Sequence, residues 1–322
     1  MEKENQLLIN KYKPIVLNDF IGNKDVTTFL NKIICLNSFP FVLIGPPGTG
    51  KTSYLEAFVN EYFNTYNIKY NSDNILFINQ LKEQGINYFK NDVKNFCQTK
   101  SKVKNLKKIV ILDNLDCIHE SSQYLIRYLM DTYSHQILFI ASACSQQKLI
   151  PPLQSRFLSH KINYPSYQEL VMLSKLIIQK ENILIHSDDI INKIVIRSNN
   201  SFRKLINILD KCRILGKELD ENLIYQLCSD INYKLYENII SLLQRDELAL
   251  AIKSMQQITD MGYSNIDIYD NFYNYIKITD LPENIKLQLI PIICVAISNF
   301  YNFYEDPFEL ILFVNHLYKI LR

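Results

Sequence analysis

FVLIGPPGTGKT, residues 41–52, decides the fold of this chain because it joins an apolar run to a glycine-rich turn that matches the pattern GxxxxGK[ST] in full. Glycines in such a turn let backbone N–H groups face a polyphosphate, while Lys51 neutralises the β and γ phosphates and the Thr52 hydroxyl binds Mg²⁺. The apolar run predicts a strand at 41–44, and residues 53–63 predict the helix whose N-terminus completes the anion site. The predicted nucleotide-binding residues of this loop are Gly45, Pro46, Pro47, Gly48, Thr49, Gly50, Lys51, Thr52 and Ser53.

Four more apolar runs follow, at residues 74–79, 108–113, 137–142 and 160–165. Amphipathic helical patterns lie between them, as expected for buried parallel strands that alternate with helices. Asp113 ends its strand at the sheet edge where open α/β folds bind ligands, so it is a candidate to hold Mg²⁺ together with Thr52. An aspartate that only caps a turn would give the same local pattern.

The pattern changes after about residue 166 to helices without strands. Three apolar-periodic stretches, broken by NNS and by Gly216, predict a small helical lid. Turn signals divide a second all-helical block after residue 231. We therefore expect a nucleotide-binding domain at 1–165, a lid domain at 166–230 and a helical domain at 231–322.

Composition excludes several classes of protein. The 322 residues are 48% hydrophobic and 21% charged, which is typical of a soluble globular protein. The net charge of +2 gives no overall reason to bind nucleic acid, so any DNA contact must come from a local patch. Seven scattered cysteines without a CxxC pair favour a reducing compartment over a disulfide framework or zinc site. The polar N-terminus and the absence of a long uninterrupted apolar run predict neither a signal peptide nor a membrane span.

Several further motifs occur in order along the chain. Residues 10–23, NKYKPIVLNDFIGN, are similar to a box KYRP-x-x-L-x-D-x-x-G-N; residues 150–157, IPPLQSRF, carry the Ser-Arg pair of an SRC motif; residues 199–210, NNSFRKLINILD, are similar to GDMRRALNxLQ; and residues 260–268, DMGYSNIDI, are similar to GYSxxDI. Over nearly its full length the chain resembles the small subunits of replication factor C, the AAA+ clamp loaders of eukaryotes and archaea.

The resemblance implies an α/β AAA+ P-loop domain, a parallel sheet with flanking helices, followed by a helical lid and an all-helical collar that holds five subunits together. It implies ATP and Mg²⁺ as cofactors. It places Arg203 as a sensor 2 residue over the γ-phosphate and Arg156 as an arginine finger on a neighbouring subunit's nucleotide. The residues that it places on the adenine are Tyr12, Pro14, Ile21 and Gly22.

The same resemblance implies the partners and the place of action. These are the other subunits of a heteropentamer, the sliding clamp and primer-template DNA, with no membrane. The expected location is intracellular, in the nucleus or, for a viral protein, at the site of viral DNA replication. Lys90 and Lys94 are weak candidates for DNA contact because they share a predicted helix face in a lysine-rich stretch, whereas lysines 100 to 108 favour a solvated loop.

Two departures from the family concern water activation. Asn114 stands where the family has a glutamate after the strand aspartate, and Cys144 stands where the family has the sensor 1 asparagine. An amide cannot accept the proton of an attacking water, and a thiol is a poor hydrogen-bonding substitute. The sequence therefore predicts ATP binding with slow hydrolysis at this chain's own site.

Three alternatives remain open at this level. The chain could be an ATP-using loader subunit, a catalytically silent scaffold that donates a finger, or a branch-migration motor of the RuvB type, which would need a winged-helix domain at its C-terminus. For single residues, Arg156 could form only a surface salt bridge, and Arg203 could be a solvated helix charge.

Overall fold

The computed structural model describes residues 6–36, 39–65, 74–79, 86–101, 106–185, 188–216, 227, 231–302 and 306–321. The chain divides into two compact units, Met1–Asp220 and Glu221–Arg322. Residues 166–220 of the predicted lid therefore belong to the same unit as the nucleotide-binding domain, whereas residues 221–230 fall in the second unit.

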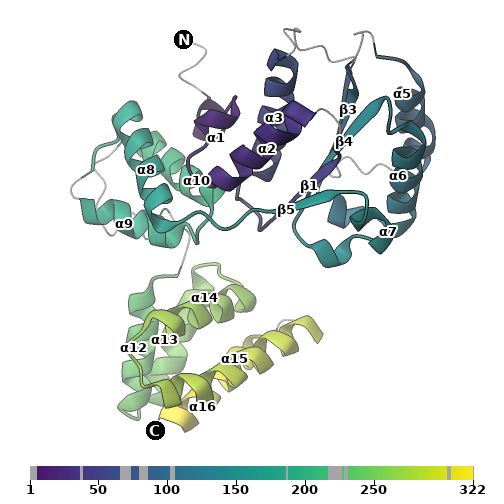
Figure 1. The fold of residues 1–322 in the computed structure, drawn as a ribbon. Helices are drawn as coiled ribbons and strands as arrows, with labels where there is room; N and C mark the ends of the chain where they lie inside the picture. The colour runs from purple at the N-terminus through teal and green to yellow at the C-terminus, as the bar shows by residue number, and fades with distance from the viewer. Residues whose placement is uncertain are drawn as a thin grey trace. The chain divides into compact units, whose positions relative to one another are not determined.

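The first unit is built on a five-stranded parallel sheet, as predicted, with the order β2-β3-β4-β1-β5 (Figure 1). The strands are β1 (Phe41–Ile44), β2 (Ile75–Asn79), β3 (Lys108–Asp113), β4 (Ile137–Ala143) and β5 (Leu158–Lys161). The central strands β1, β3 and β4 are buried along their whole length, which explains their continuous apolar sequences.

The last strand does not follow the predicted bounds. We expected it at residues 160–165, but β5 covers Leu158–Lys161 and most of its residues are exposed. Among the strands that the structure describes it pairs with β1 alone, at the edge of the sheet, so its side chains need not alternate or be apolar.

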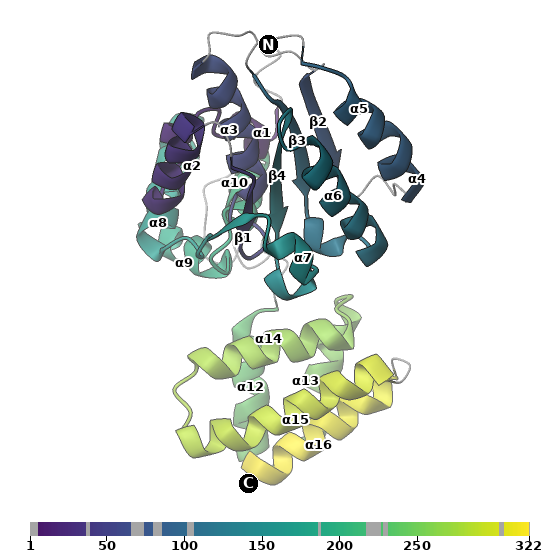
Figure 2. The same ribbon diagram turned by 45° about the vertical axis from the view of Figure 1, so that its right-hand side comes forward.

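Helices cover both faces of the sheet (Figure 2). One face packs against α2 (Lys24–Leu36) and α3 (Lys51–Thr65), and the other against α5 (Lys94–Gln98), α6 (Glu120–Tyr133) and α7 (Pro151–Gln154). The short elements between them are η1 (Leu17–Asp19), α4 (Ile86–Tyr88), the π-helical turn η4 (Phe89–Val93), η5 (Leu115–Cys117) and η6 (Gln146–Lys148).

The lid consists of α8 (Tyr167–Glu181), α9 (Asp188–Arg197) and α10 (Phe202–Leu215). Ser166 and Glu169 form a capping box at the start of α8, and Gly216 ends α10 in the left-handed conformation. The short helix α1 (Leu8–Lys11) packs against α10, so the N-terminal segment lies on the lid (Figure 1).

The second unit has its own hydrophobic core, formed by α12 (Tyr233–Gln244), α13 (Leu248–Asp260), α14 (Asn265–Ile278), α15 (Glu283–Asn302) and α16 (Pro307–Leu321). Its described elements are helices, as predicted. Against the sequence expectation, α15 is long and apolar enough to cross a membrane by length and composition alone. It packs against α14 and α16.

Candidate functional site

The candidate site is a pocket of about 470 Å³ in the first unit. Five parts of the chain line it: the N-terminal segment, the loop after β1 with the start of α3, the end of β3 with the residue that follows it, the residue after β4, and the lid. Its lining residues are Ile9, Asn10, Tyr12, Lys13, Pro14, Asp19, Phe20, Ile21, Pro47, Gly48, Thr49, Gly50, Lys51, Thr52, Ser53, Asp113, Asn114, Cys144, Leu173, Phe202, Arg203 and Ile206.

The loop after β1 is shaped by glycines and lies directly against the lid. Gly48 and Gly50 have φ of 81° and 90°, which residues with a Cβ rarely adopt. A Cβ on Gly48 would lie 2.1 Å from Ser201 Oγ. Phe202 N donates to the Gly48 carbonyl at 3.1 Å. The start of α10 and the phosphate-binding loop are therefore in backbone contact.

Lys51 is buried at the start of α3 and is held by the loop itself. Its ammonium donates to the carbonyls of Gly45 at 2.7 Å and Pro46 at 2.9 Å. Gly45 and Pro46 do not line the pocket, but their carbonyls accept hydrogen bonds from Lys51, which does line it. Since phosphate oxygens are charged acceptors, they would make stronger hydrogen bonds with this ammonium than neutral carbonyls do.

Thr52 and Asp113 meet at the end of β3. Thr52 Oγ1 lies 3.0 Å from both carboxylate oxygens of Asp113, and Ser142 Oγ donates to Asp113 Oδ1 at 2.5 Å. A hydroxyl and a carboxylate beside a phosphate-binding loop are the oxygen donors that Mg²⁺ prefers. The residues present therefore fit the metal, which when bound neutralises phosphate charge. Asp113 is 4% exposed, and Ser142 fixes its orientation.

Asn114 follows Asp113 with φ of 52° and ψ of 50°, the left-handed conformation. Asparagine is among the few non-glycine residues that adopt it readily. Its backbone N–H donates to Ser142 Oγ at 3.0 Å. Both Asn114 and Cys144 line the pocket, and Cys144 Sγ lies 3.5 Å from Lys51 Nζ. Neither of these two side chains is a base that could deprotonate water at this position.

In the part of the pocket formed by the N-terminal segment, the structure brings together three of the four residues predicted to contact the adenine, Tyr12, Pro14 and Ile21. Gly22 does not line the pocket. Gly22 has a φ of 90° and lies against α8. A Cβ added there would lie 2.4 Å from the Glu169 carboxyl carbon. Its glycine is therefore explained by this close approach of the N-terminal segment to the lid.

Arg203 lines the pocket from the first turn of α10, next to Phe202. A guanidinium there faces the same pocket as the phosphate-binding loop and can bind phosphate oxygens bidentately. Arg203 is exposed as well as on the pocket wall, so its role at the γ-phosphate stays a prediction.

Arg156 lies outside the pocket, after α7, and is bound to α6. Its Nε and Nη2 donate to the two carboxylate oxygens of Asp131 at 2.5 and 3.0 Å, and Nη1 donates to the Pro152 carbonyl at 2.7 Å. Hydrogen bonds from Arg156 hold the pKa of Asp131 below its usual range. The guanidinium is thus oriented on the surface, with no contact to this chain's own pocket.

Lys90 and Lys94 are exposed, on η4 and α5. Lys108, which we expected in a solvated loop, is instead buried in β3, where its ammonium donates to Thr99 Oγ1 at 2.5 Å and lies over the Phe96 ring. Its role is structural. Residues 102–105 of the lysine-rich stretch lie outside the described residues.

Some pocket residues were not predicted. Phe20 lines the part formed by the N-terminal segment and stacks on Tyr54, and Leu173 and Ile206 line the lid side. Their apolar character gave no signal because it is also typical of core residues. Ser142 could not be identified from the sequence as the partner of Asp113. That pairing requires knowing that β3 and β4 are neighbours in the sheet.

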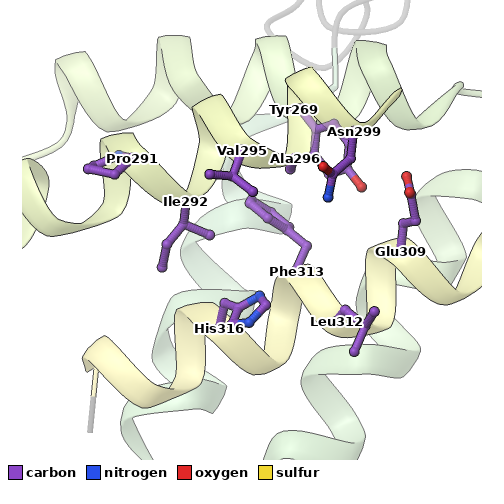
Figure 3. Close-up of a pocket in the computed structure, with 10 residues that line it drawn as sticks. All are labelled: Tyr269, Pro291, Ile292, Val295, Ala296, Asn299, Glu309, Leu312, Phe313 and His316. Carbon is purple, nitrogen blue, oxygen red and sulfur yellow. The ribbon is translucent and has the colours of Figure 1, made fainter. Parts of the chain in front are cut away.

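The second unit contains a cavity of about 320 Å³ between α15 and α16, lined mainly by apolar side chains (Figure 3). Glu309, Asn299 and His316 add polar groups to its wall. In the residues that the structure describes there, no cluster of potential metal ligands occurs.

Comparison with known proteins identifies both units. Residues 41–164 match the ATPase family associated with various cellular activities (AAA), and residues 231–297 match the replication factor C C-terminal domain. The chain therefore combines an AAA domain with a replication factor C C-terminal domain. The AAA match makes it an AAA+ ATPase with a nucleotide-binding site. The second match covers most of α15 and replaces the winged-helix domain that a RuvB-type motor would need.

Several replication factor C subunits are similar to this chain over most of their length. Replication factor C subunit 2 of Arabidopsis thaliana is 26% identical over 89% of this chain and 85% of that protein. The replication factor C small subunit of Methanococcus maripaludis is 27% identical over 88% of this chain and 89% of its own length. Replication factor C subunit 5 of Mus musculus is 25% identical over 88% of this chain and 83% of that protein.

Solved structures share the fold. The Holliday junction branch migration motor RuvB of Thermotoga maritima is 16% identical, with a TM-score of 0.54 over 74% of this chain and 80% of that protein. Domain III of the replication initiation protein DnaA from the same organism gives 0.51 over 66% of this chain and 95% of that one, at 18% identity. At such identities these likenesses establish only the AAA+ fold.

Proposed function

We propose that this chain is a small subunit of a sliding-clamp loader, which binds ATP with Mg²⁺ and helps open the clamp and load it onto primer-template DNA during replication inside the cell. The observation that carries this proposal is the presence, on one chain, of an AAA ATPase domain and a replication factor C C-terminal domain. The relatives named above are all replication factor C subunits.

Within such a complex, the pocket binds ATP through Lys51, Thr52 and Asp113, and Arg203 contacts the γ-phosphate. Arg156 acts on the nucleotide of a neighbouring subunit. This division is supported by geometry, because the Arg156 guanidinium is presented on the surface away from its own pocket and is already oriented by Asp131. An arginine supplied in trans stabilises transition-state charge by about 10³- to 10⁵-fold in rate.

A second candidate is a catalytically silent subunit that binds ATP, keeps the complex assembled and supplies only its finger. Asn114 and Cys144 favour it, since both line the pocket without offering a base. Steady-state ATP turnover of the assembled complex carrying Lys51→Ala separates the two: an active subunit loses its share of turnover, whereas a silent one leaves it nearly intact.

The experiment that tests the proposal is copurification of the full chain from its source, followed by mass spectrometry and by ATP turnover with clamp and primed DNA. We expect other replication factor C subunits to copurify. Arg156→Ala should reduce turnover of the complex and leave ATP affinity of this chain unchanged. Lys148→Ala, which removes an exposed cation from η6, is the matched control. A chain that copurifies with no such subunits would overturn the assignment.

A further inference from the structure

Three helix ends converge on one carboxylate next to the part of the pocket that the N-terminal segment lines. Glu181 is the last residue of α8, Lys11 the last of α1, and Arg213 lies in the last turn of α10. Glu181 Oε1 accepts from the Tyr12 hydroxyl at 2.5 Å and from Lys11 Nζ at 2.7 Å, and Oε2 lies 3.5 Å from Arg213 Nη1. The carboxylate therefore has partners on both the N-terminal segment and the lid.

This position is unfavourable for a carboxylate considered alone. The C-terminus of a helix carries partial negative charge, which disfavours an acidic residue in the last turn. The Glu181 side chain is also only 7% exposed. Burial raises the pKa of Glu181, but hydrogen bonds from Lys11 and Tyr12 outweigh this effect and lower it overall. The presence of an acid at position 181 is therefore not explained by helix stability. It is explained by the hydrogen bonds and ion pairs that Glu181 makes with Tyr12, Lys11 and Arg213.

The N-terminal segment is also bound to α10 by a second set of contacts. Leu8 N donates to Asp210 Oδ2 at 3.1 Å, and Arg213 Nη2 donates to the Gln6 carbonyl at 3.0 Å and lies 2.9 Å from Asp210 Oδ1. Leu8 and Asp210 are buried. Lid residues thus fix the backbone before Tyr12, while Glu181 fixes the Tyr12 side chain itself.

Tyr12 connects this polar cluster to the pocket, since it lines the pocket and its hydroxyl is bound by Glu181. We propose that Glu181 is a positioning residue for the nucleotide base: it holds Tyr12, on the N-terminal segment, at the place where the ring contacts a purine, although Glu181 itself does not line the pocket. This inference rests on the proposed nucleotide-binding function, and it assigns base recognition in part to a lid residue.

The test compares binding of MgATP with binding of magnesium tripolyphosphate, which has phosphates but no base, to the full chain. We expect Glu181→Gln to weaken ATP binding by about 5- to 20-fold, because charge-assisted hydrogen bonds to Tyr12 and Lys11 are weakened. Tripolyphosphate affinity should not change. Tyr12→Phe, which leaves the ion pairs intact, should also weaken ATP binding selectively, so the test does not depend on the folding of the Glu181 variant.

Coupling between the two positions provides the second readout. In the Tyr12→Phe background, Glu181→Gln should cause a smaller loss of ATP affinity than in the wild type. Asp189→Asn, which removes an exposed acid from α9, is the charge-matched control and should bind both ligands as the wild type does.

Two results would overturn the proposal: unchanged ATP affinity in Glu181→Gln and Tyr12→Phe, or equal losses for ATP and tripolyphosphate, which would indicate a general stabilising role. Either result leaves the proposed function standing if Lys51→Ala still abolishes ATP binding. A wild-type chain that binds no ATP would instead overturn both.

Discussion

At the scale of single residues, Asn114 can be explained by backbone conformation as well as by lost chemistry. Its φ of 52° suits asparagine or glycine, and other residues pay about 1–2 kcal/mol there. A glutamate at 114 would therefore meet some strain, but it would place a base next to Asp113. The backbone conformation also determines which substitution tests the side chain alone. Asn114→Gly removes the amide and keeps the conformation, whereas Asn114→Ala would remove the amide and also introduce backbone strain.

We predict that Asn114→Glu raises ATP hydrolysis at this chain's own site by about tenfold or more, which adds this site's share to the turnover of the assembled complex, since general-base catalysis typically contributes 10²- to 10⁴-fold and Cys144 limits the gain. Asn114→Gly should leave turnover close to that of the wild type. The measurement is steady-state phosphate release with clamp and primed DNA. Loss of activity in Asn114→Gly would mean that the asparagine is itself a working catalytic residue.

The Asp131–Arg156 pair gives a prediction about pH. Because Arg156 lowers the pKa of Asp131 from its ordinary value of 3.8, the ion pair is complete above that value and is lost as pH falls through the lowered pKa. NMR titration of the Asp131 carboxyl should give a midpoint below 3.8 in the wild type and a higher one in Arg156→Ala. Arg127 Nε lies 3.5 Å from the same carboxylate, so Arg127→Ala should shift the Asp131 midpoint less than Arg156→Ala does. Identical midpoints in all three proteins would show that the pair does not form in solution.

At the scale of elements, the contact between the phosphate-binding loop and α10 is testable through glycine. Gly48→Ala would force its Cβ against Ser201 Oγ and separate the loop from the lid. We predict a loss of ATP affinity of at least tenfold, measured by calorimetry. Gly216→Ala is the control, because Gly216 also has positive φ but has open space around it, so only local backbone strain of about 1 kcal/mol follows. Equal effects of the two substitutions on ATP affinity would contradict a direct role for the contact.

At the scale of the whole molecule, every residue that lines the nucleotide pocket belongs to the first of the two units. We predict that a non-hydrolysable ATP analogue slows amide hydrogen exchange in the N-terminal segment, the loop after β1 and the start of α10 of the isolated chain. Exchange in the core of residues 231–321 should not change. Protection of that core by the analogue, absent in Lys51→Ala, would show coupling between units that the pocket does not explain.

The parallel sheet, the phosphate-binding loop and the helical character of the rest could all be predicted from the amino-acid sequence. Strands β1, β3 and β4 are recognisable because burial on both faces requires continuous apolar runs, and the loop because its glycines have fixed spacing. The bounds of β5 were not predictable from this rule, since an exposed edge strand has no such requirement.

Contacts between residues that are distant in sequence could not be predicted in this way, because they depend on the tertiary structure. Glu181 lies 169 positions from Tyr12, and Ser142 lies 29 from Asp113, so no local pattern indicates either pair. The burial of Lys108 and the capture of Arg156 by Asp131 likewise depend on packing between elements. Local spacing encodes backbone conformation and the chemistry of a contiguous loop, whereas the partners of a charged side chain are set by the three-dimensional arrangement of the helices and strands that carry them.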